Sequence, residues 1–144
     1  MRTHTAVLAF MLLIPRVGTA QPNPLGWKAS QFVISVFQCS MVAPDTIEQE
    51  RLFNMGMKMG QDFIQFAKLN QTEEDKKIMN KEVPLVWALS WPGPSTDFIL
   101  GRVYQQIFDG LVNRQRSEIP NADKEKAQRW GHWLYQDSNC AMLR

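Results

Sequence analysis

The sequence predicts an all-α protein, a compact bundle of five to six helices stapled by one disulfide. Apolar residues recur at spacings of three and four along most of the chain, and helix-start signals precede several of these segments. The sequence has no succession of alternating strands and hairpin turns. The chain has 144 residues, so after removal of an N-terminal leader residues 21–144 suit a single helical domain.

Residues 1–20 have the pattern of a cleavable signal peptide. Arg2 precedes a nine-residue apolar run, Ala6–Ile14, and the small residues of Gly18–Ala20 lie where a signal peptidase cuts. The run is shorter than the ~20 residues that a membrane span needs. An uncleaved N-terminal anchor is the alternative, and Arg16 slightly weakens the signal-peptide interpretation. We therefore expect a periplasmic or secreted protein without stable membrane insertion.

Removing the leader also removes the net charge of the chain. The full sequence has 16 Lys and Arg residues and 14 Asp and Glu residues, and both Arg2 and Arg16 belong to the leader. The mature chain is therefore formally neutral. A basic surface of the kind that binds nucleic acid is not expected.

Gly26–Val42 is the most apolar segment after the leader, and we expect it to form the central helix of the core. Its β-branched residues would suit a strand, but its length of about 16 residues favours a helix. It carries Cys39, and the only other cysteine is Cys140 near the C-terminus. In an exported protein such a pair usually forms a disulfide, with two free thiols as the alternative. The bond would make the first and last helices neighbours.

Capping residues and prolines divide the rest of the chain into further helices. We expect these to begin near Thr46, Thr72, Pro84, Thr96 and Ala122 and to end near Leu69, Lys81, Trp91, Arg116 and Gln136. The helix that begins near Thr96 is expected to be the longest, with an inward apolar stripe that Phe98 and Phe108 extend. Asn70 begins a pattern for N-linked glycosylation, which matters only in a eukaryotic host.

Two glycines and three methionines lie close together in the helix expected from Thr46 to Leu69. Gly56 and Gly60 lie one turn apart, a spacing typical of close approach by another backbone. Packing within the same chain is the favoured interpretation, and a homodimer seam is the alternative. Met55, Met57 and Met59 cannot share one helix face, and we expect Met57 to point outward, where it could contact a partner.

The five tryptophans exceed what most domains of this size carry. Trp87 and Trp91 lie four residues apart and should share a helix face, while Trp130 and Trp133 are expected to point inward. Trp27 and Trp91 lie beside loops, so we expect them to be partly exposed. Exposed aromatic side chains are common anchors of protein interfaces.

The sequence shows no constellation of catalytic or metal-binding residues. His132 is the only histidine after the leader, and the common nucleophile, zinc, phosphate and dinucleotide motifs are missing from the sequence. The acidic residues lie at helix starts, or far apart, as are Asp97 and Asp109 at about 18 Å along one helix. We therefore expect a protein that is not an enzyme and that holds no cofactor and no metal.

The segment Ser90–Asp97 is the candidate for binding a protein partner. Pro92 and Pro94 rigidify it, and a preorganised loop loses less entropy on binding. The residues expected to bind are Trp91, Ser95 and Asp97, with Met57 as a further candidate. A plain connection between two helices is the alternative interpretation.

The layout of residues 26–140 resembles the Rap1a/Tai4-like periplasmic immunity proteins, through Cys39 on the first helix, Cys140 near the tail and the glycine-containing helices GMKMGQDF and FILGRVYQQIFDGL. The resemblance implies a protein that binds and blocks a peptidoglycan-cleaving toxin delivered by type VI secretion. We therefore expect a periplasmic inhibitor that occludes an enzyme. The alternatives are a structural or assembly factor, such as a chaperone, adaptor or oligomer subunit, and a small-ligand carrier.

Overall fold

The described residues fold into a bundle of helices. The structure, a computed structural model, describes residues 26–143, so the predicted signal peptide lies outside the described part of the chain. It contains η1 (Gly26–Lys28), α1 (Ala29–Met41), α2 (Thr46–Leu69), α3 (Glu73–Glu82), α4 (Leu85–Ser90), α5 (Thr96–Glu118), α6 (Lys124–Asp137) and η2 (Cys140–Met142). Residues 26–143 contain no strand, and the predicted all-α fold is confirmed.

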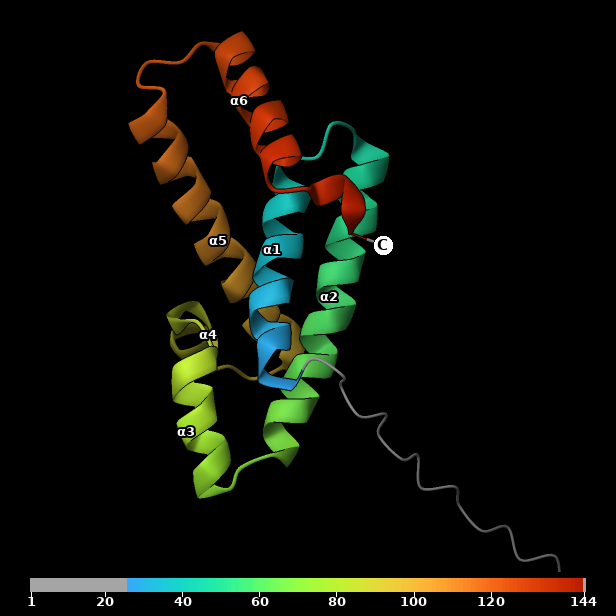
Figure 1. Ribbon diagram of the computed structural model, residues 1–144, viewed down its shortest axis with the longest axis vertical. Helices are drawn as coiled ribbons and strands as arrows, with labels where there is room; N and C mark the ends of the chain where they lie inside the picture. Colours follow the sequence, from blue (N-terminus) through green and yellow to red (C-terminus); the bar gives the residue numbers. More distant parts are fainter. Residues whose placement is uncertain (1–25, 144) are drawn as a thin grey trace, which may run out of the picture.

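Helix α1 is the centre of the bundle, as its apolar sequence predicts. It lies between α2, which runs antiparallel to it, and α5 (Figure 1). The short helices α3 and α4 cover the lower end of this arrangement, and α5 and α6 form a hairpin at the upper end (Figure 1). The hairpin therefore lies at the C-terminal end of α1.

The larger core cluster joins α1, α2, α4 and α5 around Trp87. This indole is fully buried, and its Nε1–H donates to the carbonyl oxygen of Ser30 at 3.0 Å, so its polar atom is satisfied. Trp27 packs edge-to-face on Phe63 and Phe66 and is only 7% exposed. The expectation of a partly exposed Trp27 is therefore wrong, because η1 folds this side chain back onto α2.

The glycines of α2 give room to side chains of the same chain, which confirms packing within the chain. A Cβ on Gly56 would lie 2.6 Å from the Phe37 ring, and one on Gly60 would lie 2.4 Å from Leu100 Cδ2. Side chains of α1 and α5, rather than a helix backbone, make the close approach. Met57 is half-buried against the larger cluster, so the expectation that it points outward is wrong.

The predicted caps are present in the structure. The Asp45 side chain accepts a hydrogen bond from the backbone N–H of Glu48, and the Ser95 side chain accepts one from that of Phe98. Thr72 forms a reciprocal capping box with Asp75. Helices α2 to α5 begin within one residue of their expected starts, α6 begins two residues late, and α1 begins three residues after Gly26 because η1 occupies the start of that segment. The longest helix is α2 with 24 residues, one more than α5, so the expectation that the helix beginning near Thr96 is the longest is wrong.

A disulfide joins the two ends of the described chain. Cys39 on α1 and Cys140 in η2 are bonded, with their Cα atoms 5.5 Å apart and both residues buried. Asn139 adopts a left-handed conformation just before η2, one that asparagine tolerates better than most residues, and this turns the chain back toward α1. The prediction that the disulfide makes the first and last helices neighbours is confirmed.

A second polar contact fastens α6 to the start of α2. The Tyr135 hydroxyl donates to Glu48 Oε1 at 2.7 Å, and the Arg51 guanidinium makes two hydrogen bonds to the same carboxylate. The hydrogen bonds from Arg51 and Tyr135 hold the pKa of Glu48 down at about 2. Burial and the adjacent carboxylate raise the pKa of Tyr135 to about 12. The C-terminal end of α6 is thus tied to both α1 and α2.

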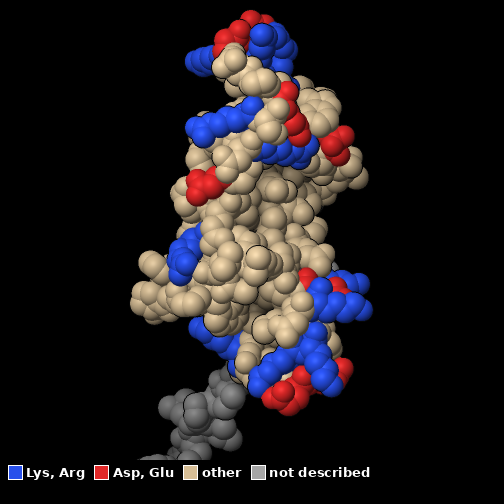
Figure 2. Space-filling model, turned by 90° about the vertical axis from the view of Figure 1, so that its left-hand side faces the viewer, with Lys and Arg blue, Asp and Glu red and all other residues tan. Residues whose placement is uncertain are grey.

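Charge is distributed unevenly over the face that carries α4 and α5. Figure 2 shows Lys, Arg, Asp and Glu side chains gathered toward the two ends of this face, with few charges in the middle. Among residues 26–143, no helix combines the length and the apolar composition that crossing a membrane requires.

Candidate functional site, a groove between α5 and α6

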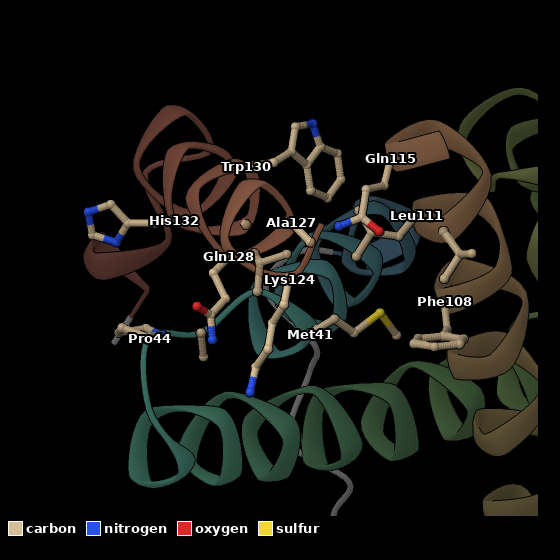
Figure 3. Close-up of a pocket in the computed structure, with 14 residues that line it drawn as sticks. Met41, Pro44, Phe108, Leu111, Gln115, Lys124, Ala127, Gln128, Trp130 and His132 are labelled. Carbon is tan, nitrogen blue, oxygen red and sulfur yellow. The ribbon is translucent and has the colours of Figure 1, made fainter. Parts of the chain in front are cut away.

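A groove of about 650 Å³ lies between α5 and α6 (Figure 3). The end of α1 and the turn after it, Met41–Pro44, form its floor, and the Met41 side chain extends toward Phe108 on the α5 wall (Figure 3). A volume of this size lies in the middle of the range for ligand pockets, about 300–1,000 Å³. Most of the lining is apolar.

Each wall of the groove is one stripe of a helix. The α5 wall consists of Phe108, Leu111, Val112 and Gln115, and the α6 wall consists of Lys124, Ala127, Gln128 and Gly131. Both sets follow the spacing i, i+3, i+4, i+7, which places the four residues of each wall on a single helix face. Trp130 and His132 complete the lining on the α6 side. The groove is therefore a slot between two helix faces.

Hydrogen bonds at the closed end of the hairpin fix the two walls relative to each other. The Trp130 indole N–H donates to Glu118 Oε2 at 2.7 Å, and Arg114 Nε donates to Oε1 of the same carboxylate at 2.7 Å. These two bonds hold the pKa of Glu118 below its ordinary value of 4.5. Since the disulfide and Tyr135 anchor the other end of α6, neither wall depends on a ligand for its position.

Gly131 leaves the α6 wall open. A Cβ built at this position meets nothing within 4 Å, although the glycine lies within a helix and costs about 1 kcal/mol relative to alanine. Gly101 and Gly110 share this property on α5 outside the groove lining, so an empty neighbourhood is not by itself a mark of function. At Gly131, however, the free space belongs to the groove.

The groove has few polar side chains. Among the fourteen lining residues, Lys124 is the only formally charged one, and Gln115, Gln128 and His132 supply the other polar side chains. The His132 ring lies 2.9 Å from the Gln136 amide on its own helix. Within residues 26–143, no three His, Cys, Asp or Glu side chains are grouped so that they could hold a metal ion.

The binding residues predicted from the sequence lie away from the groove, around the start of α5. Trp91 is half-buried against the core, Ser95 caps α5, and the exposed Asp97 accepts from Gln61 on α2 at 3.1 Å. Met57 lies one turn before Gln61 on α2. Asp97 is about 16 Å along the α5 axis from the first residue of the groove wall. The structure thus brings these four residues to one region, and the groove is elsewhere.

The segment between α4 and α5 is well fixed, in agreement with its two prolines. The Arg102 guanidinium donates to the carbonyl oxygens of Leu89 and Pro92, at 2.7 and 2.9 Å. The same guanidinium lies 6.0 Å from the centre of the Phe98 ring. Three exposed apolar side chains lie on the helices that flank this segment, Leu85 and Leu89 on α4 and Phe98 on α5, and Leu85 is 70% exposed. We call these three residues the α4–α5 patch.

Three aromatic side chains expected in the core are exposed, and the first of them, Phe98 at the start of α5, is 47% exposed. Trp133 is 47% exposed because the inward face of α6 runs through Trp130 and Leu134, and Trp133 lies to one side of it. Phe108 is 45% exposed because α5 extends beyond the core that its apolar stripe was expected to cover. Sequence reasoning missed the groove for this reason. The signal that could have revealed it is the length of the apolar stripe of α5, which continues opposite a helix, α6, whose facing residues are small or polar.

Comparison with known proteins adds no identity to this geometry. No protein-family model, no curated protein and no solved structure matches the chain. The resemblance to the Rap1a/Tai4-like immunity proteins stays a prediction from the layout of the sequence.

Proposed function

We propose that this protein is an exported, non-enzymatic binding protein that inhibits a protein partner by taking an apolar segment of that partner into the α5–α6 groove. The observation that carries the proposal is the groove itself, an open slot with a rigid frame, in which a largely apolar face of α5 lies opposite a face of α6 with small and polar residues. The layout resemblance implies that the partner is a cell-wall-degrading enzyme and that the role is that of a periplasmic immunity protein.

The apolar lining supports a binding role because water contact with it is unfavourable. Burying apolar surface contributes about 25 cal/mol per Å². Phe108, Leu111 and Val112 present such surface to the groove, and Phe108 is 45% exposed among the described residues 26–143. A partner segment placed between the walls would remove this surface from water.

The rigid frame supports tight binding because little would have to be ordered when a partner arrives. The disulfide, the Tyr135–Glu48 contact and the Trp130–Glu118 contact hold the α6 wall at both ends. Preorganisation of this kind lowers the entropic cost of association. The predicted leader and the disulfide both favour a partner outside the cytoplasm.

A pair of glycine substitutions tests the proposal. Gly131→Leu adds a side chain to the α6 wall without displacing any atom within 4 Å of its Cβ, so it should fill the groove and leave the fold intact. Gly110→Leu is the matched control, since its Cβ also meets nothing and Gly110 is exposed outside the groove lining. Both changes replace a helical glycine and should leave the circular dichroism spectrum unchanged.

The two variants and the wild-type protein would serve as bait for proteins of the periplasmic or secreted fraction of the producing cell. We expect a protein that the wild-type protein and Gly110→Leu retain and that Gly131→Leu loses. The captured protein is then assayed for peptidoglycan hydrolysis with and without each variant. Equal capture by all three baits would show that the groove is not the binding site.

A role as a structural or assembly factor is the second candidate, and the α4–α5 patch is the observation that favours it. The seam first considered, at Gly56 and Gly60, is filled by side chains of the same chain. Leu85, Leu89 and Phe98 instead expose apolar surface at a fixed turn. Sedimentation equilibrium tests this role, because a mass that rises with concentration and returns to that of a monomer in Leu89→Asp is its expected signature.

A further inference from the structure

We infer that the segment bound in the groove is a short amphipathic helix that carries a carboxylate opposite Lys124. This inference rests on the proposed function and specifies its partner. It follows from the shape of the walls, from the hydrogen-bonding capacity of the lining and from the charge of the lining, taken in turn.

The shape of the walls matches a helix. Each wall is a stripe about 10 Å long, from the seven-residue span between its first and last members at 1.5 Å per residue. A partner helix laid between two such stripes would place its residues i, i+3 or i+4, and i+7 against them, as in other helix-in-groove complexes. The expected contact is therefore about two turns long.

The hydrogen-bonding capacity of the lining also favours a helix over an extended peptide. The walls are α-helices, whose backbone N–H and C=O groups are paired with each other except for N–H groups in the first turn of α6. An extended peptide in the slot would lose water from its own backbone groups and find only Gln115, Gln128, His132 and Lys124 as side-chain partners. A helix satisfies its backbone internally, and so only its side chains need to fit.

The charge of the lining selects an acidic residue. Lys124 is the only charged residue in the lining, and no carboxylate of residues 26–143 lies within ion-pair distance of it. Its position in the first turn of α6 adds the positive end of the helix dipole to the same region. Since α5 and α6 are antiparallel, Lys124 and Gln115 lie at the closed end of the hairpin and Phe108 toward the open end. The partner helix should thus be acidic at one end and apolar along the rest of its contact face.

The probe is a phage-displayed library of 14-residue peptides on a helical, alanine-rich framework with randomised positions. Selection uses the wild-type protein, and clones that also bind Gly131→Leu are discarded. We expect the remaining sequences to carry Leu, Ile, Phe or Met at i, i+3 or i+4, and i+7, with Asp or Glu at one end of that stripe. A selected peptide is then synthesised with a fluorescent label for anisotropy measurements.

A charge exchange locates the carboxylate. Lys124→Glu should lower the affinity for the acidic peptide by about fivefold or more. Replacing the acidic residue of the peptide by lysine should restore much of the affinity for that variant. Lys126→Glu is the matched control, because Lys126 is an exposed residue of the same turn and lies outside the lining. It should change the affinity by less than about twofold at physiological salt.

The possible outcomes separate this inference from the proposed function. Groove-selective peptides without an acidic preference, and with equal affinity for Lys124→Glu, would overturn the inference and leave a groove that binds apolar segments. Groove-selective sequences rich in proline, or lacking the helical spacing, would contradict the inference that the bound segment is a helix.

Two other occupants of the groove have their own outcomes. Displacement of the peptides by dodecanoate at micromolar concentration would assign the groove to an acyl chain instead. Self-association that Gly131→Leu abolishes would assign it to a second copy of the protein. Failure to select any groove-specific peptide would contradict the proposed function as well.

Discussion

Gly60→Ala should destabilise the protein although alanine is the better helix former. The new Cβ would lie 2.4 Å from Leu100 Cδ2 and 3.3 Å from Leu100 Cδ1, well inside the usual contact distance of about 3.5–4.0 Å between carbon atoms. Leu100 is fully buried, so its methyl groups cannot move into solvent to make room. Either Leu100 leaves its preferred rotamer or α2 and α5 separate.

The magnitude follows from two opposed contributions. Overpacking a buried position costs about 1–3 kcal/mol, whereas replacing a helical glycine by alanine contributes about 1 kcal/mol of stability. We expect a net loss of up to about 2 kcal/mol for Gly60→Ala, with a central value of about 1 kcal/mol. Gly110→Ala has only the favourable contribution, because its Cβ meets nothing within 4 Å, and should gain about 0.5–1 kcal/mol.

Urea unfolding followed by circular dichroism measures the difference. A separation of about 2 kcal/mol between the two variants corresponds to roughly 1 M in the midpoint. In a Leu100→Ala background the clash is gone, and so Gly60→Ala should become neutral or stabilising there. The packing argument fails if Gly60→Ala is as stable as Gly110→Ala, or if its effect is the same in both backgrounds.

Three further predictions concern the contacts that hold α6. Reducing the disulfide between Cys39 and Cys140 opens a loop with a sequence separation of 101 and should lower the free energy of unfolding by about 2–5 kcal/mol. The measurement is a lower melting temperature in the presence of reductant. An unchanged melting temperature would contradict a stabilising role of the disulfide. Tyr135→Phe should cost about 1–2 kcal/mol at pH 7, measured by urea unfolding. Because the pKa of Glu48 is about 2 in the fold against 4.5 ordinarily, this cost should persist above pH 4.5 and fade as the pH falls toward 2; a pH-independent cost would show that the ionised carboxylate is not involved. In NMR spectra, the resonance of the Trp130 indole N–H, which donates to Glu118, should shift with pH below 4.5 as Glu118 is protonated. Glu118→Gln should abolish this pH-dependent shift.

Local signals of the sequence were sufficient for the helices. Asp45, Thr72 and Ser95 cap helices because a side-chain oxygen satisfies a backbone donor two or three residues away, which needs no tertiary partner. The pairing of Cys39 with Cys140 was equally accessible, since two cysteines allow only one intramolecular bond. The boundaries of the helices from α2 to α6 agree with the structure within about two residues because these determinants are local.

The exposure of individual side chains was not accessible in the same way. Trp27 lies beside a proline-rich arm, yet it is buried because η1 folds it against the aromatic rings of α2. Phe108 continues the apolar stripe of α5, yet it is exposed because α1 ends below it. Helical periodicity states which residues share a face but does not state how far the opposing surface extends.

The sequence by itself determined the fold class and the helices with their caps, because those depend on neighbouring residues, and it allowed only one intramolecular disulfide, whose formation the structure shows. Only the tertiary structure decided where α5 and α6 separate, and hence that Phe108, Leu111, Ala127 and Gly131 line a groove rather than a core. The physical reason is that the angle between two helices is set by the summed packing of side chains from α1 and η2, which are distant in the sequence.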